Sequence, residues 1–163
     1  MDLRPGGEDD LPALTELYNH YVTSSLATFD DVPFTIDQRR EWLHHYDTTG
    51  PHRLVVAVED DRLLGYATSS PFRPKPGYRT TVEISVYVDA AATGRGVGQR
   101  LYTRLFEELD GQPLHRALAG IAVPNPESVR LHERFGFSHI GTYTEVGTKL
   151  GEWVDVAWYE RPL

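Results

Sequence analysis

The chain has 163 residues, a length typical of one domain that buries its own core. Its composition is that of a soluble globular protein, and a formal net charge of -8 disfavours nucleic-acid binding, which needs a basic surface. No apolar run approaches the roughly 20 residues of a membrane span, and the acidic first residues contain no apolar signal segment. We therefore expect one domain over residues 1–163, cytoplasmic, with no membrane or nucleic-acid partner. The absence of cysteine excludes disulfides and thiolate chemistry.

The first half of the sequence predicts two helices followed by a hairpin. Leucines and tyrosines at helical spacing predict a helix over 8–22, with an aspartate available as its N-cap. A second helix is predicted over 36–46, before a Thr-Thr-Gly-Pro cluster. Apolar runs at 53–58 and 62–68 around an acidic turn predict a β-hairpin, and a short strand fits at residues 3 and 4.

The second half alternates strands and helices. In chain order the patterns predict a strand over 81–88, a helix over 96–109, a strand over 116–123, a helix from Asn125 to Gly136, and strands over 137–147 and 153–161. Strands that alternate with helices in this way indicate a mixed α/β sheet covered by helices.

Three glycines, Gly94, Gly96 and Gly98, lie between a predicted strand and a predicted helix. The spacing matches neither a dinucleotide fingerprint, because the third glycine is not at the required position, nor a P-loop, because no Gly-Lys-Ser/Thr follows. One interpretation is an anion cradle, in which backbone N–H groups lead into a helix N-terminus and Arg95 and Arg100 add charge. The other is a flexible connection, and the pattern alone leaves both open.

Two titratable residues are candidates for acid-base chemistry. Glu83 lies in the middle of a strand, where glutamate is disfavoured, on the same face as Ser85 and Tyr87. This face is either solvent-exposed or the floor of a polar cleft in which the carboxylate accepts a proton, directly or through water. His132 is one of seven histidines and carries no signal by itself. No metal-ligand spacing such as His-Glu-x-x-His occurs, so we expect no metal.

The segment 69–79 is rich in proline and basic within an acidic chain. Arg73, Lys75 and Tyr78 in this segment could hold an anionic, zwitterionic or amino-acid-like ligand. The alternative is a solvated loop without a ligand.

The motifs "GRGVGQRLYTRL", "PNPESVRLHERFGF" and "EVGTKLGEWVDV" together resemble the GCN5-related N-acetyltransferase (GNAT) superfamily. More closely, the chain resembles its branch of phosphinothricin and methionine sulfoximine N-acetyltransferases, over nearly its whole length. The resemblance implies an α/β fold with a mixed, mostly antiparallel central sheet flanked by helices. Its central strands would splay apart to form a cleft for acetyl-CoA. It also implies a homodimer and resistance to the herbicide phosphinothricin.

The resemblance assigns the co-substrate acetyl-CoA to the strand, the glycine loop and the following helix. Backbone groups of Val86 and Val88 would bind the pantetheine arm, and residues 94–99 would wrap the pyrophosphate. The complete set is Val86, Tyr87, Val88, Gly94, Arg95, Gly96, Val97, Gly98, Gln99, Asn125 and Ser128. Thr93 stands where the superfamily motif has Gln or Arg, which removes one charged partner of the phosphates.

The resemblance also implies roles in catalysis and acceptor binding. Glu83 would take a proton from the acceptor ammonium through water, and His132 matches the position of the group that protonates the leaving thiolate. The acceptor is a small amino-acid-like amine such as phosphinothricin, methionine sulfoximine or methionine sulfone. Its groove would be lined by Phe29, Arg73, Lys75, Tyr78 and Tyr87. Lys149, Trp153 and Asp155 belong to a branch motif with a structural or dimer-related role.

Two other functions remain open from the sequence. The same fold could acetylate another amine, such as a protein N-terminus or a polyamine, although the basic and aromatic segment 69–79 favours a small anionic amino acid over a polycation. A non-catalytic acyl-CoA-binding module is the second alternative, and the presence of both Glu83 and His132 favours an enzyme over it.

Overall fold

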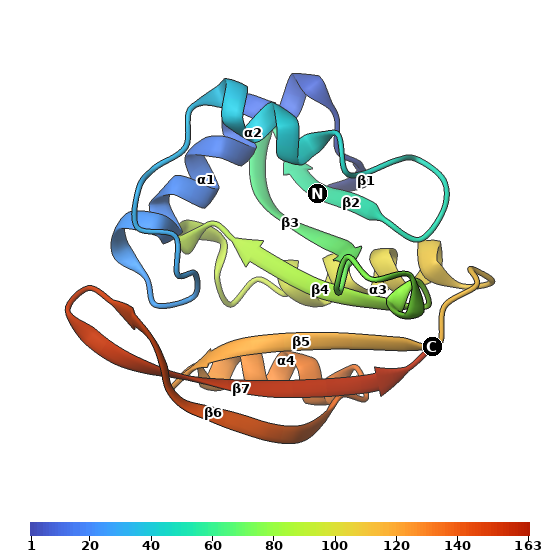
Figure 1. Cartoon of the computed structure of the whole chain (residues 1–163). Helices are drawn as coiled ribbons and strands as arrows, with labels where there is room; N and C mark the ends of the chain where they lie inside the picture. The colour runs from blue at the N-terminus through green and yellow to red at the C-terminus, as the bar shows by residue number, and fades with distance from the viewer.

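In the computed structural model, which describes residues 1–163, seven strands form one sheet with the order β1-β2-β3-β4-β5-β7-β6 (Figure 1). The strands are β1 (Asp2–Pro5), β2 (Arg53–Glu59), β3 (Arg62–Pro71), β4 (Thr81–Val88), β5 (Arg116–Val123), β6 (Ser138–Lys149) and β7 (Glu152–Pro162). Every neighbouring pair is antiparallel except β4 and β5, which run parallel. This arrangement confirms the expected mixed and mostly antiparallel sheet.

Four helices pack on the sheet. They are α1 (Leu11–Ser24), α2 (Ile36–Leu43), α3 (Val97–Leu109) and α4 (Pro126–Arg134), with short 3-10 turns at Glu8–Asp10, Pro76–Tyr78 and Ala90–Ala92. None of these helices combines the length and the apolar character that crossing a membrane requires.

The two faces of β2 show how the helices divide between the sides of the sheet. Leu54 and Val56 pack in a core with α1 and α2, whereas Val55 and Ala57 pack in a second core with α3. Side chains alternate between the faces of a strand, so an apolar run without polar interruptions indicates burial on both faces. The run at 53–58, predicted as one strand of a hairpin, is therefore a strand covered by helices on both sides.

Two helix ends differ from the sequence prediction. The helix predicted over 36–46 ends at Leu43, and Tyr46 turns back to place its hydroxyl 2.9 Å from Ser70 Oγ on β3. The helix predicted from residue 8 begins as a 3-10 turn, and α1 starts at Leu11. Asp10 is the residue before α1, but its carboxylate accepts hydrogen bonds from Arg4 and from the Gly7 N–H rather than capping α1. Tertiary contacts thus override the local pattern at both ends.

The parallel strands β4 and β5 pair over only three positions, from Thr81 with Arg116 to Glu83 with Leu118. Beyond Glu83 no further pair forms, although β4 continues to Val88 and β5 continues to Val123. The two strands therefore diverge in the middle of the sheet, as expected for splayed central strands. This divergence creates the space for the candidate site.

Candidate active site

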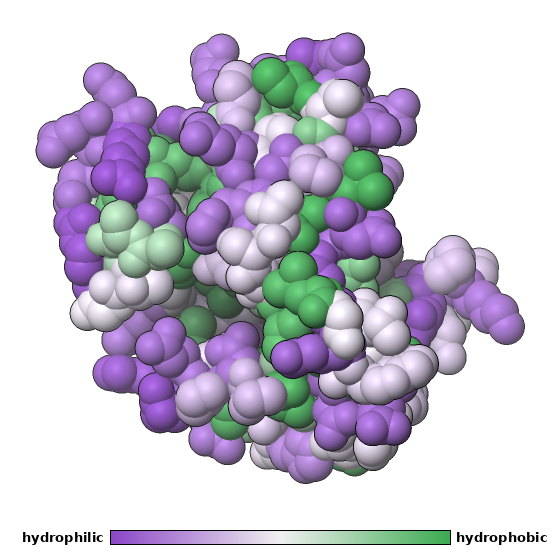
Figure 2. Space-filling view, turned by 90° about the vertical axis from the view of Figure 1, so that its left-hand side faces the viewer, coloured by the Kyte–Doolittle hydropathy of each residue, from purple (hydrophilic) through white to green (hydrophobic).

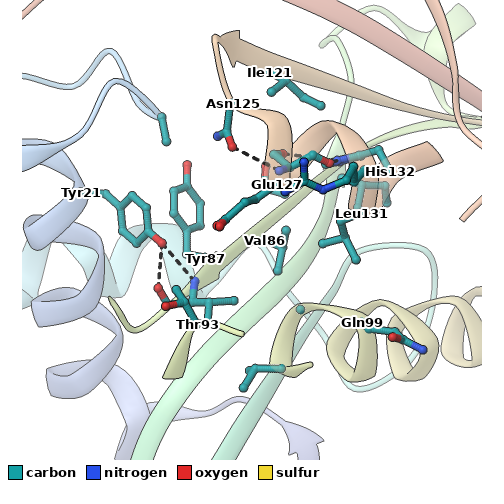
Figure 3. Close-up of a pocket in the computed structure, with 18 of the residues that line it drawn as sticks. Tyr21, Val86, Tyr87, Thr93, Gln99, Ile121, Asn125, Glu127, Leu131 and His132 are labelled. Atoms are coloured by element: carbon teal, nitrogen blue, oxygen red, sulfur yellow. Dashed lines mark hydrogen bonds between the residues drawn. The ribbon is translucent and has the colours of Figure 1, made fainter. Parts of the chain in front are cut away.

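A cavity of about 430 Å³ lies between the diverging strands β4 and β5 (Figure 3). Its walls come from β4, the glycine loop with the start of α3, β5 and α4. Ten of the residues expected to bind the co-substrate line it: Val86, Tyr87, Val88, Gly94, Gly96, Val97, Gly98, Gln99, Asn125 and Ser128. Arg95 does not line it, because its guanidinium pairs with Glu59 on β2 at 2.5 Å.

The glycines of this loop meet two separate structural requirements, a left-handed backbone and close helix packing. Gly94 and Gly96 have φ angles of +74° and +75°, in the left-handed region that favours glycine. Gly96 is also the N-cap residue of α3, so the unpaired N–H groups of the first helical turn begin directly after it. At Gly98, a Cβ would lie 3.1 Å from Leu131 Cδ2 of α4, so glycine lets α3 and α4 approach closely. Positive φ angles and close helix packing thus require these glycines, and the loop leads into the unpaired N–H groups of α3, a geometry that suits an anion.

The backbone of β4 faces the same cavity. The Tyr21 hydroxyl on α1 donates a hydrogen bond of 2.7 Å to Val88 O, and the Val88 N–H lies 3.4 Å from the same oxygen (Figure 3). Both polar groups of Val88 thus point away from β3. Because these groups alternate between the two sides of an antiparallel strand, those of Val86 point the same way. Val86 therefore presents backbone groups to the cavity, while Tyr21 already holds those of Val88.

His132 lines the cavity but is almost fully buried, with 3% of its surface exposed. Its Nδ1 donates to Ser128 O at 2.7 Å, and its Nε2 accepts from the Tyr102 hydroxyl at 2.8 Å, which defines the neutral tautomer. Burial lowers the pKa of His132, opposed by the bond to Ser128. The imidazole is therefore neutral at pH 7, with both ring nitrogens engaged.

A second cavity of about 340 Å³ contains Glu83 and is bounded by Phe29, Tyr143 and Trp158. It shares lining residues with the first cavity, namely Ala27, Gly120 and Ala122. The two cavities are therefore parts of one continuous cleft. Burial raises the pKa of Glu83, and the positive charge of Arg73 acts against this rise. Glu83 thus lies where β4 and β5 part, and its carboxylate binds a proton more strongly than that of a solvent-exposed glutamate.

The branch motif near the C-terminus holds the walls of this second cavity. Lys149 is 4% exposed, and its ammonium donates to the backbone oxygens of Val22 and Asp30. The Asp155 carboxylate accepts from the Glu145 N–H at 2.7 Å. These contacts tie the end of α1 and the β6–β7 hairpin together. Trp153 is 69% exposed and lines neither cavity.

The basic segment after β3 lies outside both cavities. Arg73, Lys75 and Tyr78 are exposed, and none of them lines the cleft. The Arg73 guanidinium lies 4.8 Å from the centre of the Phe72 ring, and that ring lies 6.0 Å from Trp158, which lines the second cavity. The segment therefore reaches the neighbourhood of Glu83 from its solvent side.

Sequence reasoning missed three residues that the structure brings to the site. Tyr21 follows the helical spacing of the leucines in α1, yet its hydroxyl reaches the cleft. Arg130 on α4 is an exposed cation at the edge of the cleft. Arg39 is buried at 4% exposure beside Tyr87, although nothing in "DQRRE" distinguishes it from Arg40.

Comparison with known proteins places this geometry in a family. Residues 3–158 match the model of the acetyltransferase (GNAT) domain. The chain is 58% identical to a phosphinothricin N-acetyltransferase of Streptomyces coelicolor, covering 100% of this chain and 96% of that protein. It is 35% identical to an L-methionine sulfoximine/L-methionine sulfone acetyltransferase of Salmonella typhimurium, covering 100% and 95%.

A solved structure agrees with these relatives. A phosphinothricin acetyltransferase of the GNAT superfamily from Sinorhizobium meliloti, in complex with acetyl-CoA, superimposes with a TM-score of 0.94 at 31% identity, covering 99% of this chain and 88% of that one. The chain therefore belongs to the GNAT acetyltransferase family and has its fold. It is an acyltransferase, and acetyl-CoA is the co-substrate of this family.

The cleft suits this co-substrate. A glycine loop with left-handed residues at the start of α3 offers N–H groups to a diphosphate, and the Val86 backbone offers hydrogen bonds to an amide-bearing arm. Thr93 is uncharged and its hydroxyl donates to Ala90 O, while Arg95 is paired with Glu59. Arg130 is the arginine that lines the cavity.

We predict that Gly96→Val weakens acetyl-CoA binding at least about tenfold, because a β-branched residue at positive φ distorts the cradle. Isothermal titration calorimetry measures the affinity. Gly111→Val is the matched control, since Gly111 has a φ of +73° just beyond the other end of α3. Equal affinities in the two variants would contradict the role of the cradle.

Proposed function

We propose that this protein transfers the acetyl group of acetyl-CoA to the amino group of a small amino-acid-like acceptor of the phosphinothricin, methionine sulfoximine or methionine sulfone type. The observation that carries this proposal is the half-buried Glu83, which lines the second cavity where it joins the co-substrate cleft. The relatives named for these acceptors support the class of substrate.

Glu83 is the proposed base. The amine of an amino acid is mostly protonated at neutral pH and has no lone pair for attack until a base removes a proton. Burial raises the pKa of Glu83 above its usual 4.5, so the carboxylate holds a proton more strongly than an exposed glutamate does. Glu83 takes the proton directly or through one water, and the freed amine then forms its bond to the acyl carbon.

Two further groups would act at the acyl carbon and at the sulfur. The Val86 N–H points into the cleft and is the proposed donor to the oxygen that gains negative charge when the amine attacks. The bond from carbon to sulfur then breaks, and the leaving thiolate needs a proton. His132 is the proposed source because it is the imidazole on the cleft wall. Because the neutral imidazole carries no proton at Nε2, it must first take one from solvent there, in place of the hydrogen bond that Tyr102 now donates, and then pass it to the sulfur.

We predict that the protein releases free thiol from acetyl-CoA with phosphinothricin, methionine sulfoximine or methionine sulfone. Spermidine should give a kcat/KM at least about tenfold lower, because Arg73, whose charge acts on Glu83, repels a polycation. A peptide with a free N-terminus should also give a kcat/KM at least about tenfold lower, because it lacks the free α-carboxylate of an amino acid. A thiol-release assay with this panel measures the preference. Thiol release with the peptide or spermidine alone would overturn the proposed acceptor class.

We predict that Glu83→Gln lowers kcat by about 10²- to 10⁴-fold, the usual contribution of a positioned base, with little change in acetyl-CoA affinity. In the wild type, kcat/KM should rise with pH through a value above 4.5, because the raised pKa belongs to the group that must lose its proton before it acts. That rise should vanish in the variant. Glu107→Gln, on the exposed face of α3, is the control. An unchanged kcat would refute the base assignment.

We also propose that two copies of the chain associate through the β6–β7 hairpin. Large apolar side chains are exposed along this hairpin: Ile140, Tyr143, Val146, Leu150 and Trp153. Figure 2 looks onto the side where the hairpin ends, with apolar groups in green beside a hollow in that face. Exposed apolar patches of this kind mark interaction surfaces. Tyr143 and Val146 also line the cavity of Glu83, so a partner copy would close its edge.

We predict that Trp153→Asp turns a dimer into a monomer, because a charge in an apolar contact must be desolvated. Size-exclusion chromatography with light scattering measures the mass. Val32→Asp is the control, since Val32 is 70% exposed but lies outside the hairpin. A monomeric wild type, or a variant that remains dimeric, would contradict this interface.

A further inference from the structure

A third cavity, of about 260 Å³, lies between α1, α2 and the strands β3 and β4. Its lining includes Ser85 and Tyr87, which also line the co-substrate cleft. The cavity also contains the guanidinium-bearing residue Arg39, which belongs to neither of the cavities described above.

Arg39 is 4% exposed, yet it forms no ion pair, and its Nε and Nη2 atoms have no hydrogen-bond partner. Its guanidinium carbon lies 3.5 Å from the centre of the Trp42 ring and 4.4 Å from that of Tyr18. Cation–π contacts of this kind offset part of the cost of burying the charge, but they leave the N–H groups at the edge of the guanidinium without acceptors. A buried cation in this state is completed by an anion that accepts its hydrogen bonds.

The carboxylate of Asp30, which lines this cavity, is not the acceptor of the Arg39 hydrogen bonds. Asp30 is the acidic residue of the lining, but its carboxylate accepts from the hydroxyls of Tyr18 and Thr28 and makes no ion pair with Arg39. The remaining polar groups of the lining are neutral, and two of them, the hydroxyls of Tyr46 and Ser70, bond each other. Asp30 thus adds a negative charge to the lining, but the Nε and Nη2 atoms of Arg39 are left without an acceptor from the protein.

The register of β3 and β4 places this charge beside the proposed base. Ser70 is paired with Glu83, Thr68 with Ser85, and Tyr66 with Tyr87. Directly paired residues on one face have Cβ atoms about 4.5–5.5 Å apart, and alternate residues along a strand are about 7 Å apart. Ser70 lines the Arg39 cavity, while its partner Glu83 lines the acceptor cavity. The lining of the Arg39 cavity therefore adjoins Glu83 through Ser70.

We propose that Arg39 is the centre of an anion subsite that binds the carboxylate or phosphinate of the acceptor while Glu83 faces its amine. This inference rests on the proposed function and identifies the residue that selects acidic acceptors. It assigns this selection to a buried cation, in addition to the exposed cations of the segment after β3. A free inorganic anion accepts hydrogen bonds from a guanidinium in the same way. The experiments below therefore distinguish binding of the acceptor from binding of a free anion.

The first experiment compares methionine sulfone with its α-carboxamide, which keeps the amine and loses the negative charge. In Arg39→Met we expect kcat/KM for the acid to fall about 10- to 100-fold through KM, the size expected for one lost charge-assisted hydrogen bond. The value for the amide should change less than about threefold. Arg39→Lys should restore part of the preference for the acid. Arg40→Met is the control, since Arg40 lies on the same helix and pairs with Glu8 and Asp37 at the surface.

An equal loss with both acceptors would show that Arg39 only supports the packing of Trp42 and Tyr18, and it would overturn the proposal. So would an unchanged kcat/KM for the acid. Far-ultraviolet circular dichroism and the thermal midpoint establish that each variant is folded.

The second experiment does not depend on turnover. Acetate and dimethylphosphinate should raise the thermal midpoint of the wild type more than chloride at equal ionic strength, and this difference should disappear in Arg39→Met. No anion-dependent rise in the wild type would overturn the subsite even if the enzyme acetylates the panel. A rise without any thiol release would instead refute the proposed function. A rise together with equal kinetic losses for acid and amide would assign the subsite to free anions and overturn its link to the acceptor.

Discussion

Backbone pairing between β4 and β5 stops after three residue pairs, and the functional geometry of the molecule depends on this interruption. A buried strand whose polar groups lose their partner must find other acceptors and donors. Tyr21 supplies them for Val88, while Val86 keeps its groups directed into the cleft. The strands part at Glu83, so the same interruption places a carboxylate at the junction of two cavities.

The cradle for the co-substrate follows from local backbone geometry and close packing. Two glycines at positive φ turn the chain into α3, and a third allows α3 and α4 to approach each other. Side-chain charge in the loop contributes less to anion binding than the arginine in its sequence suggests, because Arg95 is paired with Glu59 and Thr93 is neutral. The oriented N–H groups at the start of α3 are therefore the main feature that the loop offers to an anion.

Charges near the acceptor are divided between the surface and the interior. Arg73 and Lys75 lie exposed outside the cavity, where water and salt screen them. Arg39 is buried between two aromatic rings, where screening is weak and an unsatisfied cation has a high cost. A positive side chain thus attracts an anion more strongly at the buried position than at the exposed ones, because burial reduces the screening of its charge.

Much of the fold could be predicted from the sequence because its signals are local. Alternation over 81–88, the doubly buried run at 53–58 and the helical spacing after Gly96 each depend on the periodicity of one element. The motifs around "GRGVGQ" and "LHE" identified the family, which the comparisons confirm. The limits of the helices near Asp10 and Leu43 were less predictable, because a salt bridge to Arg4 and a turn toward Ser70 determine them.

The sequence by itself determined the order of the elements, the glycine loop and the presence of a carboxylate on β4. Only the tertiary structure decided which charged residues are solvated and which are buried. Arg39 and Arg40 are neighbours with identical side chains, yet one lies between Trp42 and Tyr18 and the other pairs with surface carboxylates. Their difference arises from contacts between α1, α2 and the sheet, and no pattern within a single helix contains that information.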